Sequence, residues 1–167
     1  MLALFSSFCD WLNRQVALLT ALLLFAMLIF SSFAVFFRYV MGDAINWAED
    51  VLLPAFVWVS LLGVSIAFRY KAHIRVDSLQ NLLPASLQKQ LNRLIQLSII
   101  SFSAYLTIQG AKVVLATRGM PWGILQLPPT YFYIAFPISF LIIFLYAIDD
   151  FLTGFRASQT EPDNQQF

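Results

Sequence analysis

The sequence predicts an all-α integral membrane protein with four transmembrane helices, and its composition and pattern both support this fold class. Apolar residues make up 60% of the 167-residue chain and charged residues only 11%, whereas a soluble domain carries about 25% charge. Four long runs are continuously apolar, while the strands of a membrane barrel alternate apolar and polar residues. Each run approaches or exceeds the roughly 20 residues that a helix needs to cross the hydrocarbon core.

We expect the four spans at about residues 15–37, 51–68, 94–111 and 130–151, within a single membrane domain of residues 1–157. The first run lies between Arg14 and Arg38 and contains no charge. It is longer than the apolar part of a signal peptide, about 7–15 residues, so we interpret it as a retained helix. The polar segment 158–167 is predicted to be a disordered cytoplasmic tail.

The distribution of Lys and Arg predicts that both termini and the middle loop are cytoplasmic. With four spans, these three segments share one side of the membrane and hold most of the basic residues. They are Arg14, Arg69, Lys71, Arg75, Lys89, Arg93 and Arg156, against Arg38, Lys112 and Arg118 on the other side. The expected location is therefore the bacterial inner membrane, with an N-in, C-in topology.

The middle loop contains the pattern of an amphipathic helix, at about residues 76–93. Leu83, Leu87, Leu91 and Leu94 recur at steps of four, four and three, which places them on one helical face. Such a helix lies in the membrane interface with its apolar face down, and Pro84 divides it. The alternative is an ordinary solvated connection between the second and third spans.

The interiors of the four spans contain no Asp, Glu, Lys, Arg or His. An ionisable residue at mid-membrane usually marks an ion pathway, so we do not expect this chain to transport a substrate alone. We expect no catalytic site, because Asp50 and His73 are predicted on opposite membrane faces, separated by a helix about 28 Å long from Asp50 to Arg69. We expect no metal site, because His73 is the sole histidine. A net charge of +1 gives no basis for nucleic-acid binding.

A specific pattern occupies the stretch from Asn46 to Asp77. A tryptophan and an acidic pair open the second span, a tryptophan and Leu-Gly follow within it, and a basic residue precedes His-Ile-x-Val-Asp. The positions are Trp47, Glu49, Asp50, Trp58, Leu62, Gly63, Arg69, His73, Ile74, Val76 and Asp77. This pattern resembles the small membrane subunit of TRAP transporters, of the DctQ or SiaQ type. One departure is Leu53-Pro54, where many members have a basic residue and an aromatic residue, so the acidic pair needs another partner such as Arg38 or another subunit.

The resemblance implies a small, scaffold-stabilising subunit of a sodium-coupled, binding-protein-dependent transporter. Such transporters take up organic acids, for example sialic acid or C4-dicarboxylates. The implied partners are a large membrane subunit of the M or DctM type, a periplasmic substrate-binding protein and membrane lipids. Sodium is expected in the large subunit, and no cofactor is expected in this chain. The alternative function is a membrane anchor of a redox enzyme that binds haem or quinone.

The conspicuous residues fall into two groups of candidates. Candidates for packing or subunit contact are Trp47, Glu49, Asp50, Trp58, Gly63 and Ser65. We expect the acidic pair to favour the start of its helix, the small residues to permit close helix packing, and Trp58 to offer its N–H to a partner. Candidates for a cytoplasmic anchor are Arg69, Lys71, His73, Arg75 and Asp77. The three basic residues among them are expected to contact anionic lipid heads, and His73 and Asp77 to hydrogen-bond each other.

Overall fold

The computed structural model of the chain describes residues 2–71 and 85–157, and the named elements in this part are all helices. In chain order they are α1 (Leu2–Phe36), the π-helical turn η1 (Phe37–Met41), α2 (Ala48–Lys71), α4 (Ala85–Ala116), α5 (Thr130–Tyr133) and α6 (Ala135–Ala157). Four segments are long and apolar enough to cross a membrane, namely Leu4–Met41, Ala48–Tyr70, Arg93–Ala116 and Thr130–Thr153. The predicted fold class, an all-α protein with four spans, is confirmed.

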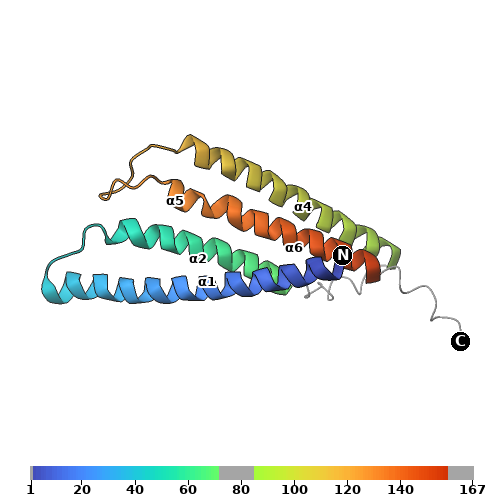
Figure 1. Cartoon of the computed structure of the whole chain (residues 1–167), viewed down its shortest axis with the longest axis horizontal. Helices are drawn as coiled ribbons and strands as arrows, with labels where there is room; N and C mark the ends of the chain where they lie inside the picture. Colours follow the sequence, from blue (N-terminus) through green and yellow to red (C-terminus); the bar gives the residue numbers. More distant parts are fainter. Residues whose placement is uncertain (1, 72–84, 158–167) are drawn as a thin grey trace, which may run out of the picture.

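The helices lie side by side in the order α1, α2, α6, α4 (Figure 1). Helix α6 packs on both α2 and α4, and α1 packs on α2 and also reaches α6. Helix α4 has no comparable contact with α1 or α2. The fold is therefore close to a single layer, with α1 forming one edge and α4 the other.

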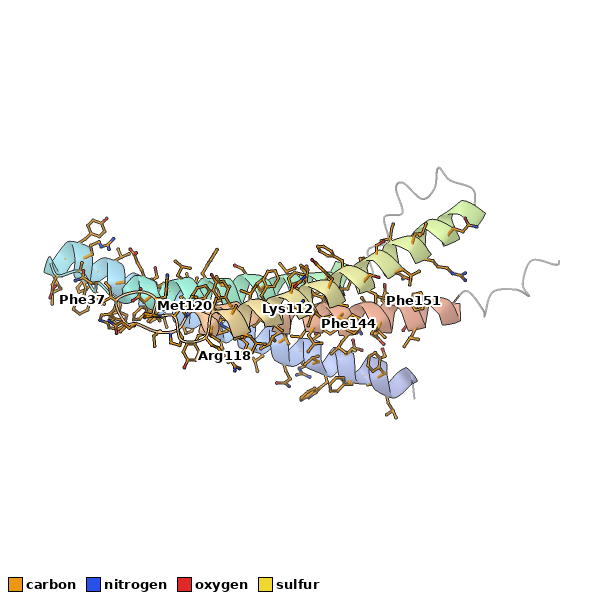
Figure 2. The ribbon with its side chains drawn as sticks, turned by 90° about the horizontal axis from the view of Figure 1, so that it is seen from above. Phe37, Lys112, Arg118, Met120, Phe144 and Phe151 are labelled. Carbon is orange, nitrogen blue, oxygen red and sulfur yellow. The ribbon has the colours of Figure 1, made fainter. Side chains whose placement is uncertain are left out.

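The two ends of the layer differ in what they hold. Figure 1 shows the start of α1 and the end of α6 at the same end, and both helix connections that follow α1 and α4 at the opposite end. Figure 2 agrees, with Phe37, Arg118 and Met120 toward one end and Phe151 toward the other. We call these the terminal end and the loop end. The basic-residue count predicts that the terminal end is cytoplasmic.

Helix α1 begins well before the predicted span, because its first turns pack against the other helices. Cys9, Asn13 and Val16 are buried and recur at steps of four and three, so they lie on one face of α1. At the loop end the helix finishes in the π-helical turn η1 and stops at Gly42, whose φ of 70° is left-handed. That conformation suits glycine, which has no Cβ to clash.

The predicted boundary between an interfacial helix and the third span is not present. Residues 76–84, with Leu83, lie outside the described residues. From Ala85 onward the chain is one continuous helix, α4, so Leu87, Leu91 and Leu94 belong to the same helix as the third span. The spacing of these leucines predicted the helical conformation. Periodicity alone does not indicate whether one helix ends and another begins within the segment.

The fourth span is interrupted near its start. Helix α5 ends at Tyr133 and α6 begins at Ala135, with Ile134 between them. Pro137 lies in the first turn of α6, where the missing N–H of proline costs no helical hydrogen bond. The segment that follows carries the protein's central contacts, since Ile142 and Tyr146 of α6 pack with Cys9, Val16 and Leu62 in one buried cluster.

Candidate functional site

Charged side chains join three helices at the terminal end. The guanidinium of Arg69, near the end of α2, donates to Asp10 Oδ1 of α1 at 2.6 Å and to Asp149 Oδ2 of α6 at 2.7 Å. The guanidinium carbon also lies 5.4 Å from the ring centroid of Tyr146 on α6, within the range of a cation–π contact. We call Asp10, Arg69, Tyr146 and Asp149 the Arg69 cluster.

The burial of this cluster determines which of its ion pairs contributes most to the stability of the chain. The side chain of Arg69 is 12% exposed and that of Asp149 is 5% exposed, whereas that of Asp10 is 67% exposed. An exposed ion pair contributes little, about 0–1 kcal/mol, while a buried one is costly to break because it leaves a charge without a partner. The pair of Arg69 with Asp149 is therefore the principal contact of the cluster.

The Arg69 cluster changes the interpretation of Arg69. The sequence favoured a lipid anchor for this residue, but the structure gives it two carboxylate partners within the chain in place of lipid head groups. Sequence reasoning selected neither Asp10 nor Asp149 as a contact residue. The available signal was that all three charges are predicted at the same membrane face, each near the end of a helix.

A second polar contact joins α2 to the connection between α4 and α5, at the loop end. Asp50 is 8% exposed, and its Oδ2 accepts a hydrogen bond from the backbone N–H of Leu125 at 2.9 Å. A Cβ added at Gly123 would overlap the Asp50 carboxylate, and the φ of Gly123 is +73°. Glycine is therefore required at this position on two grounds, space and backbone conformation. We call Asp50, Gly123 and Leu125 the Asp50 contact.

The indole of Trp58 adds a hydrogen bond between the same two parts of the chain. Its Nε1–H donates to the backbone carbonyl oxygen of Tyr131 in α5 at 2.9 Å. This agrees with the expectation that a tryptophan within a span finds an acceptor for its N–H. Together with the Asp50 contact, it fixes the start of the fourth span against the first half of α2.

Glu49 behaves differently from its neighbour Asp50. Its carboxylate lies 3.9 Å from Arg38, and both side chains are exposed, by 80% and 56%. Arg38 was the expected partner of the acidic pair, and it is found near Glu49. The ring of Trp47 lies tilted against that of Phe30 of α1, with the ring centroids 5.8 Å apart, so it too is used in helix packing within the chain.

The two small residues of α2 also differ from one another. Ser65 is fully buried and donates its hydroxyl proton to the Leu62 carbonyl at 2.7 Å. A Cβ added at Gly63 meets nothing within 4 Å, so Gly63 makes no close helix contact in the described chain. The close contact is instead at Gly110 of α4, where an added Cβ would lie 3.1 Å from the ring of Pro137.

The remaining candidates of the predicted anchor lie at or beyond the edge of the described residues. Lys71 is the last residue of α2. His73, Arg75 and Asp77 lie outside the described residues, as does the predicted tail 158–167. In the part of the chain that the structure describes, no group of three or more His, Cys, Asp or Glu side chains is arranged to hold a metal ion.

The Asp50 contact gives a testable difference between two adjacent carboxylates. Replacing Asp50 with Ala should lower the free energy of unfolding by about 1–3 kcal/mol, because the Leu125 N–H loses a charged acceptor. Replacing Glu49 with Ala is the matched control and should change it by less than about 1 kcal/mol, as expected for an exposed pair. Thermal unfolding in detergent measures both, and equal losses would contradict the assignment.

These observations define a class of protein: a multi-pass α-helical membrane protein whose buried charged side chains hold its own helices together. The chain belongs to the DctQ family. Residues 27–157 match the family described as "Tripartite ATP-independent periplasmic transporters, DctQ component". The protein is therefore a transport component of the bacterial inner membrane and not an enzyme, and the family assignment favours this class over a redox-enzyme anchor.

Similar proteins carry the same family description or a related one. The chain is 33% identical over 90 residues to the C4-dicarboxylate TRAP transporter small permease protein DctQ of Vibrio cholerae, covering 54% of this chain and 39% of that protein. It is 27% identical over 107 residues to a putative TRAP transporter small permease protein of Haemophilus influenzae, covering 64% and 66%. It is also 36% identical over 62 residues to the sialic acid TRAP transporter permease protein SiaT of Haemophilus influenzae, covering 37% and 10%. The chain thus spans at most 66% of the length of these relatives.

Proposed function

We propose that this chain is the small, scaffold-stabilising subunit of a sodium-coupled, binding-protein-dependent transporter of organic acids. It associates with a large membrane subunit, which carries the substrate and sodium sites. A periplasmic binding protein delivers the substrate to this membrane complex. The contribution of the small subunit is mechanical: it forms a fixed body against which the large subunit moves.

The observation that best supports a fixed body is the use of charged side chains at both ends of the layer. The Arg69 cluster joins α1, α2 and α6 at the terminal end. The Asp50 contact joins α2 to the α4–α5 connection at the loop end. Ionisable groups within membrane spans usually belong to transport pathways, whereas Arg69, Asp149 and Asp50 are already bonded within the chain. A helix layer joined at both ends resists relative motion of its helices.

The names of the relatives support an organic carboxylate as the substrate class. One relative is named for C4-dicarboxylates and another for sialic acid, and both ligands carry carboxylate groups. Identities of 33% and 36% over different lengths do not separate the two. We therefore assign the chain to organic-acid uptake in general and leave the choice of acid to a substrate panel.

Co-purification tests the proposed partnership directly. This chain, with an affinity tag, is expressed together with a large TRAP permease subunit of the DctM type and is purified in mild detergent. We expect the two to elute as one complex in equal amounts. Recovery of this chain alone, with the large subunit remaining in the membrane fraction, would contradict the proposal. A haem absorption band in the purified complex would indicate the redox-anchor function instead.

A further inference from the structure

The outward face of α4 carries a continuous polar stripe. At about 100° per residue, every position of one narrow sector of the helix between residues 98 and 112 is polar. The sector is about 80° wide, and the stripe is about 21 Å long. Its residues are Ser98, Ser101, Tyr105, Gln109 and Lys112. We call these five residues the α4 stripe.

The α4 stripe points away from the rest of the described chain. Ser103, Gly110 and Val114 are buried and form the opposite side of α4, where Gly110 meets Pro137 of α6. Within the stripe, Ser98, Ser101 and Lys112 are exposed and Tyr105 is 57% exposed. Figure 2 views the layer from the α4 edge, with Lys112 labelled. The stripe therefore lies on the free edge of the layer, beyond the reach of α1 and α2.

The opposite edge of the layer is different in character. Between Val16 and Val35, the exposed positions of α1 are all apolar except Ser32, whose hydroxyl donates to the Leu28 carbonyl of its own helix at 2.8 Å. This surface suits direct contact with lipid chains. The third span also has the lowest mean hydropathy of the four, 1.5 against 2.1 to 2.5. The polar stripe therefore distinguishes the α4 edge from the α1 edge, although the exposed residues of α4 beside the stripe, such as Phe102 and Ile108, are apolar.

Polar side chains of the stripe retain unused hydrogen-bonding capacity at membrane depth. Tyr105 lies midway along the span Arg93–Ala116, and its hydroxyl oxygen accepts from Gln109 Nε2 at 3.0 Å. That bond leaves the Tyr105 proton and the Gln109 carbonyl oxygen available. Polar groups without partners in hydrocarbon are costly, and in membrane proteins they hydrogen-bond across helix interfaces. The complementary surface must therefore be a protein helix that offers both acceptors and donors.

We propose that the α4 stripe is the surface that binds the large membrane subunit, through a transmembrane helix bearing hydroxyl or amide side chains. The exposed apolar edge of α1 faces lipid. This inference rests on the proposed function, and it adds which face of the chain makes the subunit contact. Ser98 and Ser101 allow the two helices to approach closely, while Tyr105 and Gln109 supply the directional hydrogen bonds. Lys112, one turn before the end of α4, pairs with an anionic group near the membrane surface.

Photo-crosslinking in the intact complex tests this assignment. A benzophenone amino acid is placed at Ser101 or Tyr105 on the stripe, and at Leu22 or Phe25 on the exposed face of α1 as controls. After co-expression with the large subunit and irradiation of membranes, we expect an adduct with the large subunit from the stripe positions only. Adducts from Leu22 or Phe25 and none from the stripe would overturn the assignment, as would adducts between two copies of this chain at the stripe.

Substitutions provide a second measurement that does not depend on crosslinking. The double variant Ser101→Leu/Gln109→Leu should reduce the fraction of large subunit that co-purifies, by about threefold per hydrogen bond lost. The control Phe25→Leu should leave that fraction unchanged. If the large subunit co-purifies equally with all variants, the stripe is not the interface although the proposed partnership stands. If it co-purifies with none, including the unmodified chain, the proposed function itself fails.

Discussion

Replacing Arg69 with Met is expected to lower the free energy of unfolding by about 3–5 kcal/mol, because it leaves a buried carboxylate without its partner. The carboxylate is that of Asp149, whose side chain is only 5% exposed. Methionine preserves much of the side-chain volume, so the loss of stability reports mainly the loss of the positive charge. Thermal or denaturant unfolding of the full chain in detergent gives the measurement, with the helical circular dichroism signal as the readout.

Neutralising each carboxylate in turn separates the two ion pairs of the cluster. Asp10→Asn should cost less than about 1 kcal/mol, because the side chain of Asp10 is 67% exposed. The double variant Arg69→Met/Asp149→Asn should recover a large part of the stability lost in Arg69→Met, since both buried charges are removed together. If Asp10→Asn proves as damaging as Arg69→Met, or if the double variant recovers nothing, the buried pair is not the principal contact.

The second large effect is expected at Gly110, where α4 lies in close contact with α6. A Cβ at this position would lie 3.1 Å from the Pro137 ring and 3.2 Å from its backbone nitrogen. Gly110→Leu should therefore separate the two helices and destabilise the chain by about 3 kcal/mol or more, at the upper end of overpacking effects. Unfolding of the purified chain and protease sensitivity of the α4–α5 connection both report this separation.

Gly63→Leu is the matched control for Gly110→Leu. It makes the same replacement within a span, but an added Cβ at Gly63 meets nothing within 4 Å. The isolated chain should unfold at nearly the same midpoint as the unmodified protein, since leucine is also the better helix former. Comparable losses at Gly63 and Gly110 would contradict the packing described for α4 and α6.

The contrast between these two glycines shows where sequence reasoning reaches its limit. The four spans could be predicted because charges such as Arg14 and Arg38 bound each apolar run, and lipid imposes a minimum length on each helix. Gly63 was selected for close packing because it belongs to a recognisable pattern, whereas Gly110 lies outside that pattern. Which glycine meets a neighbour depends on the rotation of each helix about its axis, and a continuously apolar run contains little information on that rotation.

The contacts of the candidate site could be predicted only in part from the sequence. Asp50 and Trp58 could be selected as residues with contacts to make, because a carboxylate at a helix start and an indole within a span both need partners. Their partners, the Leu125 N–H and the Tyr131 carbonyl oxygen, are backbone groups, which any residue type provides. Arg69 was assigned to lipid because its partners Asp10 and Asp149 lie 59 and 80 positions away.

The extension of α4 illustrates a different limit. The leucine stripe that includes Leu87 and Leu91 predicted a separate interfacial helix, yet residues from Ala85 onward are continuous with the third span. An apolar helical face suits either an interfacial helix or the packed face of a longer one. The two arrangements differ in the angle between residues 85–93 and the third span. That angle depends on contacts with other parts of the protein.

The proposed function requires that this chain supports transport without carrying the transport site. Uptake of a radiolabelled organic acid into proteoliposomes, driven by a sodium gradient and with the binding protein present, tests it directly. We predict uptake only when both membrane subunits are present, and none with this chain alone. The complex with Arg69→Met should lose uptake in proportion to the amount of assembled complex. Sodium-driven uptake by this chain in the absence of the large subunit would contradict the proposed function.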